Sequence, residues 1–131
     1  MSDEVIRLNQ ILLNAIASGN FAVYNELCAN DLTCFEAETK GSVVQGKSFH
    51  KFFFDLDAAL ASPPQKKVPT KVINMAGTHV RCIGDDVVVL SYTRLDQSVD
   101  GDNGLVIKTA SETRVWERRD GNWVHVHFHK S

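Results

Sequence analysis

Three histidines alternate near the end of the chain, in the stretch GNWVHVHFHKS. Alternation is the period of a β-strand, so His125, His127 and His129 are predicted to lie in a row on one strand face, together with Trp123. A neighbouring pair would lie about 6.6 Å apart and could share a metal ion, whereas the outer two, about 13 Å apart, could not. No cysteine or carboxylate accompanies them at ligand spacing. The row therefore predicts a face packed against a neighbouring subunit rather than a metal site.

Three basic residues occupy predicted strand faces that are otherwise apolar. Val88, Leu90 and Tyr92 lead to Arg94, Ala110 and Trp116 flank Arg114, and Val124, Val126 and Phe128 lead to Lys130. Buried cations need anionic partners or ligands. Three such cations in one sheet predict a partly buried basic pocket for a small anion.

The register of the last hairpin decides whether these cations share a face. A two-residue turn at Asp120 and Gly121 would place Arg114 opposite His127. A three-residue turn over 119–121 would place Arg114 opposite Val126, and only this register puts Arg114 and Lys130 on the same face. The residues alone leave both registers open.

Tyr24, Glu36 and His50 carry side chains that can transfer protons, and a cavity lined by them could host isomerase or dehydratase chemistry. Such a site needs a carboxylate or imidazole whose pKa is shifted to suit proton transfer, opposite a group that stabilises negative charge. The sequence names candidates without an arrangement. It contains no GxSxG, no phosphate-binding glycine loop, no HExxH and no kinase catalytic loop. A small-molecule enzyme or a plain binding module therefore stays an alternative.

Composition narrows the remaining classes. The chain has 131 residues, of which 44% are hydrophobic and 23% charged, with a formal charge of −2, which suits one globular domain over 1–131. Without a basic block, nucleic acid and anionic membranes are not expected partners. The acidic, amphipathic start is no signal peptide, and no apolar run approaches the roughly 20 residues that span a bilayer. The three cysteines, Cys28, Cys34 and Cys82, have no CxxC spacing, so we expect them to be buried and reduced in a cytoplasmic protein. No cofactor is expected.

Periodicity predicts helices first and strands afterwards. Helical spacing indicates a long helix that ends at Gly19, a short one over 21–28 and a third over 48–60. Short extended segments are expected at 32–38 and 43–46, and the proline-rich stretch 61–69 is expected to form an exposed loop. Strands are predicted at 70–83, 86–99, 105–118 and 122–130, separated by GDD, DGDNG and RDGN turns. The fold class is α+β, with a cone-shaped, curved antiparallel sheet wrapped around the long first helix.

Several stretches identify a family resemblance over residues 3–131. They are RLNQILLNAIASGNFAVYNELCANDLTCFEAE, FHKFFF, HVRCIGDD, YTRLDQ and SETRVWERRDGNWVHVHFHKS. Together they resemble the association, or hub, domain of calcium/calmodulin-dependent protein kinase II. The resemblance implies the fold of nuclear transport factor 2 and SnoaL-type cyclases. It also implies dimers that assemble into two stacked rings, so that the chain's main partner is itself and kinase domains are gathered around the ring.

The resemblance further implies a pocket for small carboxylates at Tyr24, Glu36, His50, Arg94, Arg114 and Lys130, and it favours the three-residue register. Glu36 and His50 would offset only part of the positive charge of the pocket, so a small carboxylate is expected to bind there. We expect Arg114 to be its chief contact, because the guanidinium of Arg114 can engage both carboxylate oxygens. The alternative is an internal salt bridge closed by Glu36. Lys130 stands where the family often has arginine, and the loop 56–69 differs from that of animal kinases. An excised domain and a stand-alone hub protein both fit this sequence, and it does not predict the ring size.

Overall fold

The computed structural model describes residues 2–36, 42–60, 71–100 and 104–131. The helices are α1 (Ser2–Ser18), α2 (Phe21–Leu27) and α3 (Ser48–Leu60), and the strands are β1 (Cys28–Phe35), β2 (Val44–Gln45), β3 (Lys71–Ile83), β4 (Val87–Asp100), β5 (Gly104–Arg119) and β6 (Asn122–Lys130). The predicted helices and the four long strands are confirmed, with ends that differ by one or two residues. β1 begins four residues before its predicted start, and the predicted loop 61–69 lies outside the described residues.

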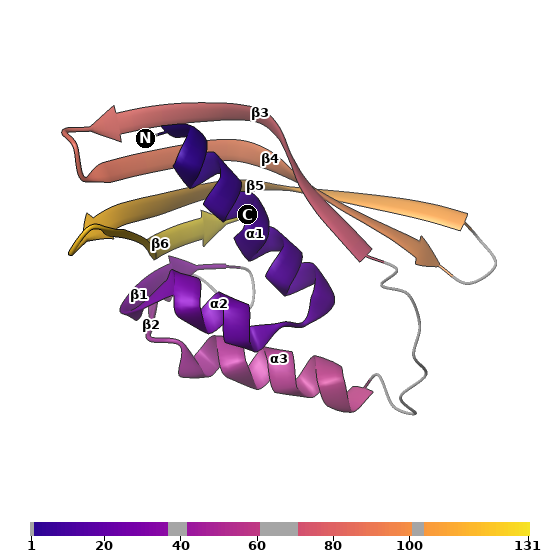
Figure 1. Ribbon diagram of the computed structural model, residues 1–131. Coiled ribbons are helices and arrows are strands. Elements are labelled where there is room, and N and C mark those ends of the chain that lie inside the picture. The colour runs from indigo at the N-terminus through magenta and orange to yellow at the C-terminus, as the bar shows by residue number, and fades with distance from the viewer. Residues whose placement is uncertain (1, 37–41, 61–70, 101–103) are drawn as a thin grey trace.

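The strands form one sheet in the order β2-β1-β6-β5-β4-β3. The last four strands make the predicted antiparallel meander. β1, however, pairs with β6 in parallel, so the sheet is mixed rather than purely antiparallel. In Figure 1 the sheet curves, α1 crosses one face of it, and α2 and α3 lie beside β1 and β2.

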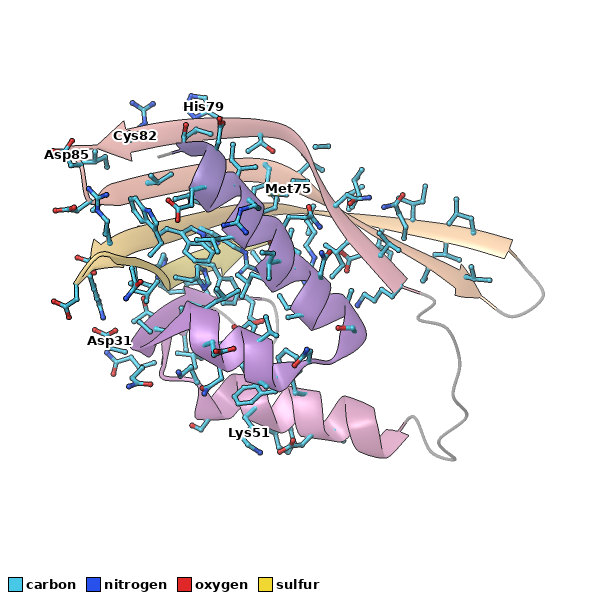
Figure 2. All side chains as sticks on the ribbon, in the orientation of Figure 1. Asp31, Lys51, Met75, His79, Cys82 and Asp85 are labelled. Carbon is cyan, nitrogen blue, oxygen red and sulfur yellow. The ribbon has the colours of Figure 1, made fainter. Side chains whose placement is uncertain are left out.

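Side chains from α1 and from the sheet fill the space between them, as Figure 2 shows. Helix α1 buries Val5, Leu12, Leu13 and Ala15, all members of the apolar stripe that helical spacing predicts, and it also buries Asn9, which that stripe did not include. The sheet contributes Ile73, Val88, Leu90 and Trp116, which are all fully buried. This core confirms the sheet packed around the first helix.

The corner between α1 and α2 is built from local hydrogen bonds. Gly19 has a φ of 73°, and its N–H donates to the carbonyl of Ile16 while the N–H of Asn20 donates to that of Ala15. This arrangement satisfies the last carbonyls of α1. The side chain of Asn20 then accepts from the N–H of Val23 and caps α2. The tight corner places α2 in contact with α1, β1 and β6.

The last hairpin has a two-residue turn, not the three-residue turn that the resemblance favours. Asp120 and Gly121 have φ of 50° and 83°, and Arg119 pairs with Asn122 across them. Both positive φ values match the turn that Asp-Gly prefers.

A bulge farther along β6 overturns the predicted histidine row. Trp116 pairs with His125 but Val115 pairs with His127, so Val126 is an extra residue in β6. A bulge of this kind sets two residues against one and inverts the alternation beyond it. His125 therefore faces the core with Trp116, whereas His127 and His129 lie on the opposite face.

The same bulge brings the predicted cations together in a register that neither turn model gave. Arg114 pairs with Phe128, and Lys130 pairs with Glu112. Residues 112 and 114 alternate on one strand, so Arg114 and Lys130 do lie on the same face. The shared face is confirmed, but both predicted partners of Arg114 are wrong.

The predicted interface is wrong for Trp123 and His125, because both are buried within the chain itself. Trp123 is 7% exposed and lies beneath the guanidinium of Arg118, 5.3 Å from the ring centroid. His125 is fully buried, with its Nδ1 3.4 Å from the Cys28 Sγ. Cys28 and Cys34 are buried as predicted, but Cys82 is exposed.

Candidate functional site

A buried carboxylate holds two of the predicted cations. Glu112 on β5 lies between Arg94 of β4 and Arg114 of β5, with its Oε2 2.8 Å from Arg94 Nη1 and 3.0 Å from Arg114 Nη2. Arg94 also forms a two-bonded ion pair with Asp96, at 2.6 Å and 3.2 Å. The side chains of Glu112 and Arg114 are 0% and 1% exposed, so each charge is compensated by the opposite charge beside it and not by water.

The electrostatics of this pair favour the charged forms of both groups. Burial alone would raise the pKa of Glu112, but the guanidinium groups of Arg114 and Arg94 outweigh it and lower the pKa to about 2. Burial alone would lower the pKa of Arg114, and the Glu112 carboxylate outweighs it and raises that pKa. Two opposite charges are therefore locked inside the fold.

Hydrogen bonds connect this ion pair to helix α1. The Tyr92 hydroxyl donates to Glu112 Oε1, and Arg114 Nε donates to the Tyr92 hydroxyl at 3.0 Å. Asn9 of α1 donates to the same hydroxyl at 3.1 Å and accepts from Trp116 Nε1 at 2.9 Å. Burial raises the pKa of Tyr92 to about 12, which keeps it protonated as a donor.

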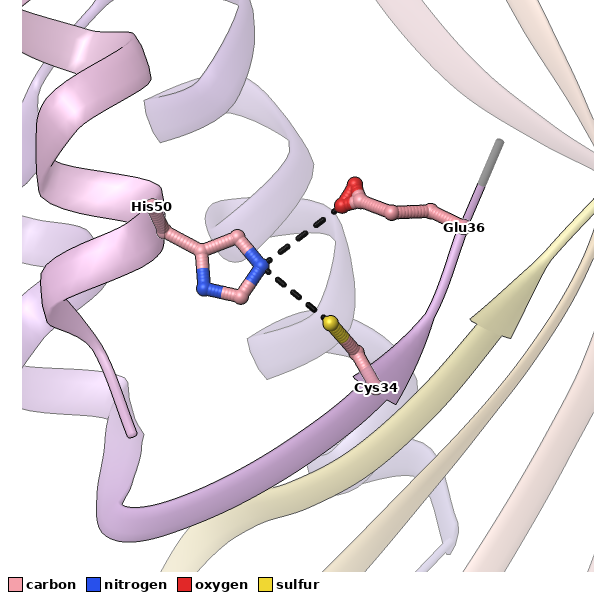
Figure 3. Close-up of side chains that lie close together, drawn as sticks. All are labelled: Cys34, Glu36 and His50. Atoms are coloured by element: carbon pink, nitrogen blue, oxygen red, sulfur yellow. Dashed lines mark hydrogen bonds and ion pairs between the residues drawn. The ribbon is translucent and has the colours of Figure 1, made fainter. Parts of the chain in front are cut away.

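A second cluster lies where β1 meets α3. His50 Nε2 lies 3.6 Å from Glu36 Oε2 and 3.5 Å from Cys34 Sγ (Figure 3). The buried ring of Tyr24 packs beside His50, with 5.7 Å between ring centroids. Burial raises the pKa of Tyr24 well above its ordinary value. The predicted trio of Tyr24, Glu36 and His50 is thus brought together.

Phe128 connects the two clusters. Its ring centroid is 4.3 Å from the Arg114 guanidinium carbon, and 5.6 Å and 5.7 Å from the ring centroids of His50 and His125. His125 Nε2 also approaches Arg114 Nη1 at 3.3 Å, and burial followed by Arg114 lowers its pKa well below the ordinary range. A neutral imidazole beside a guanidinium can accept a hydrogen bond from it.

The structure therefore gathers five of the six predicted pocket residues, namely Tyr24, Glu36, His50, Arg94 and Arg114, and sets Lys130 opposite Glu112 on the same face. One premise of the prediction is wrong: Arg94 and Arg114 are not left without counter-ions. The carboxylate that pairs with both arginines inside the chain is Glu112, rather than Glu36 as the alternative prediction had it.

Sequence reasoning missed Glu112 and Asn9. Glu112 stands two positions before Arg114, so the alternation that placed the cations on one face places this carboxylate there as well. Asn9 is buried on α1 together with the apolar stripe, and its polarity there was the signal for a buried hydrogen-bonding partner.

Comparison with known proteins gives consistent results across the chain. The family model "Calcium/calmodulin dependent protein kinase II association domain" matches residues 1–131. The rabbit (Oryctolagus cuniculus) calcium/calmodulin-dependent protein kinase type II subunit delta is 39% identical over 128 residues, which are 98% of this chain and 23% of that protein. The chain thus spans about a quarter of the length of this curated relative.

Solved structures of similar fold agree with this family assignment. The calcium/calmodulin-dependent protein kinase II hub homology domain of Chlamydomonas reinhardtii is 44% identical, with a TM-score of 0.90 over 99% of this chain and 96% of that one. An NTF2-like protein of Pseudomonas putida is 19% identical, with a TM-score of 0.75 over 98% of this chain and 84% of that one, which shows the fold alone. Among the described residues, no helix combines the length and apolarity needed to cross a bilayer.

Proposed function

Since the chain belongs to the calcium/calmodulin-dependent protein kinase II association domain family, we propose that it is an oligomerisation hub whose copies close into a double ring that would gather kinase domains. The match covers the association domain of the kinase relative and not its catalytic part, so the chain is no enzyme of that kind. A single domain and a cytoplasmic location belong to the same proposal, and the three free cysteines suit a reducing compartment.

The observation that carries this proposal is an exposed apolar patch on the sheet. Val72, Val99, Leu105 and Ile107, here called the arm patch, are 51%, 58%, 65% and 54% exposed. Val72 and Ile107 each pair with Gln97 of β4, and Val99 pairs with Leu105, so all four lie on one face. Alternation puts this face opposite to the one that buries Leu90 and Tyr92, where the ends of β4 and β5 extend beyond α1 (Figure 1).

A second copy of the chain is the occupant that the family favours. Contiguous exposed apolar side chains mark interaction sites in soluble proteins. A heterologous contact repeated through a closing rotation gives a ring, and obligate interfaces of this kind bury on the order of 2,000 Å² or more. The arm patch supplies the apolar centre that such an interface requires.

Native mass spectrometry tests the assembly directly. We expect wild-type protein at micromolar concentration to give a ring of many subunits, and Ile107→Glu, which sets a charge in the arm patch, to give smaller species. The control is Lys108→Glu, which changes the exposed neighbour on the other face of β5. A wild-type mass of one or two chains contradicts the hub function, and an intact Ile107→Glu ring contradicts the role of the arm patch.

The outer face of β6 supplies the remaining part of the predicted interface. His127 and His129 lie there, with Phe35 of β1 opposite His129 and their ring centroids 5.5 Å apart. We propose that this face also contacts a neighbouring subunit. His129→Glu is expected to shift the assembly to smaller species, and an unchanged ring would count against this contact.

We propose carboxylate binding as a second function, centred on Lys130 rather than Arg114. Lys130 is half-buried next to Glu112 on the pocket face, and no ion pair holds it among the described parts of the chain. A bound acid would give this cation a counter-ion, while Arg94 and Arg114 keep Glu112.

A thermal-shift titration with acetate- to butyrate-sized acids tests this second function. At 100 times the dissociation constant, binding would add about 2.7 kcal/mol to stability. The shift should shrink in Lys130→Gln and persist in Lys108→Gln, a lysine exposed farther along β5. Absence of any shift in wild type, or an equal shift in Lys130→Gln, would reject carboxylate binding at this position.

A further inference from the structure

Three different ligand groups converge at the edge of the core. Cys34 lies near the end of β1, Glu36 follows that strand, and His50 belongs to the first turn of α3. Cys34 Sγ, one Glu36 carboxylate oxygen and one ring nitrogen of His50 all lie within 4.8 Å of one another. Figure 3 shows the three side chains pointing to a common point between them.

One atom of His50 faces both of the other groups. Its Nε2 is 3.5 Å from Cys34 Sγ and 3.6 Å from Glu36 Oε2. A single N–H on this nitrogen points along one line, so hydrogen bonding alone cannot align with the sulfur and the carboxylate at once. Sulfur, oxygen and nitrogen atoms grouped this closely could also hold a metal ion.

The spacing of the three atoms fits tetrahedral zinc. Zinc–ligand bonds of about 2.0 Å to nitrogen and oxygen and about 2.3 Å to sulfur give tetrahedral edges of about 3.3 Å between nitrogen and oxygen and about 3.5 Å between nitrogen and sulfur. The distances in the structure are 3.6 Å and 3.5 Å. The third edge, between Cys34 Sγ and the Glu36 carboxylate oxygen, is at most 4.8 Å, against about 3.5 Å at a tetrahedral zinc ion. Binding the ion therefore needs these two side chains to approach each other by up to about 1.3 Å.

Charge and burial agree with this geometry. Cys34 is fully buried, and the side chains of His50 and Glu36 are 10% and 13% exposed. A thiolate, a carboxylate and a neutral imidazole balance the two charges of Zn²⁺, so the complex would add no net charge to a site of low dielectric. The nearby cation Arg114 already has Glu112 as its counter-ion and does not oppose the ion unshielded.

We propose that Cys34, Glu36 and His50 form a divalent metal site, best suited to Zn²⁺, that binds through Sγ, Oε2 and Nε2. Three protein ligands leave one coordination position for water or a small anion. No metal was predicted from the sequence, because the alternating histidines lack a cysteine or carboxylate at ligand spacing. The site uses instead a C-x-E pair, whose side chains share one side of an extended segment, and a histidine from a helix.

Cobalt(II) is the probe that tests the proposal, because a cobalt–thiolate bond gives a sulfur-to-metal charge-transfer band. The full-length chain is titrated in a reducing buffer free of thiols. We expect one cobalt per chain, a charge-transfer band in the near ultraviolet, and displacement by Zn²⁺. Cys34→Ser should abolish the band, and Glu36→Gln should lower affinity at least about 100-fold, more than outer-shell changes cost.

Cys28→Ser is the matched control. Cys28 is also buried and its Sγ also lies 3.4 Å from a histidine nitrogen, that of His125, but no acidic group completes a set of three there among the described residues. This variant should keep the cobalt band. Cobalt bound by His127 and His129 would lack the charge-transfer band and would be lost in His127→Gln instead.

The wild-type spectrum decides the proposal whether or not the variants fold. No charge-transfer band at a two-fold excess of cobalt overturns it. A band that persists in Cys34→Ser, with native circular dichroism, also overturns it. Neither result depends on ring assembly, which native mass spectrometry reports separately.

Discussion

Replacing Glu112 by glutamine is expected to destabilise the fold far more than its size change suggests. The substitution keeps the shape of the side chain and removes its charge. Arg114, which is 1% exposed, would then be buried without its carboxylate, and Arg94 would keep only Asp96. The amide would also present a donor to the guanidinium groups and the Tyr92 hydroxyl, which are themselves donors to Glu112.

The magnitude follows from two separate observations. The two arginines lower the pKa of Glu112 from its ordinary 4.5 to about 2 in spite of burial. At about 1.4 kcal/mol for each pKa unit, ionisation of this one group favours the fold by on the order of 3 kcal/mol. Removing one partner of a buried ion pair costs about 3–5 kcal/mol in proteins generally. We expect Glu112→Gln to lose about 3–5 kcal/mol.

Urea unfolding at one fixed protein concentration measures this loss, since dissociation of an assembly contributes to apparent stability. The matched control is Glu117→Gln, the same substitution on the same strand. Glu117 pairs with Arg119 at 2.7 Å, with side chains 39% and 44% exposed, so its loss should be below about 1 kcal/mol. A loss below 1 kcal/mol for Glu112→Gln, or equal losses for the two variants, would refute the account of the buried pair.

Two further predictions concern pH and the contact with α1. The free energy of unfolding should fall in two steps as the pH is lowered. The first step begins below about pH 6.5, because the pKa of His125 is lowered in the folded state, so the unfolded chain binds a proton that the folded chain does not bind. The second step runs from about pH 4.5 toward 2, because protonation of Glu112 breaks its ion pairs. Urea titrations at several pH values measure this, and an unchanged midpoint between pH 7 and 5 would contradict the first step. Asn9→Ala should cost about 1–3 kcal/mol by leaving the Trp116 N–H without its acceptor, whereas Asn14→Ala on the exposed side of α1 should cost little; equal costs would rule out that role for Asn9.

Much of the candidate site was predictable because strand alternation is a local property. Arg94 and Arg114 were assigned to core-facing positions from their apolar neighbours alone, and both are buried there. The residues alone named Tyr24, Glu36 and His50 as candidates for proton transfer without an arrangement, and the family resemblance placed them in one pocket, since no local pattern relates a residue of α2 to one of α3. Glu112 was also predictable from the alternation that located Arg114, because it stands two positions before Arg114 on the same strand.

The sequence by itself determined the elements and their order. Helical spacing, a Gly-Asn corner and Asp-Gly turns act over a few residues, so they specify helices, strands and antiparallel hairpins without reference to the rest of the chain. Only the tertiary structure decided the phase of β6 and the pairing of charges. The bulge at Val126 has no local signal: the register on either side of it depends on which face packs against α1 and on the parallel contact with β1, both made by distant residues. That single extra residue turns His125 into the core, leaves His127 and His129 outside, and sets Lys130 beside Glu112.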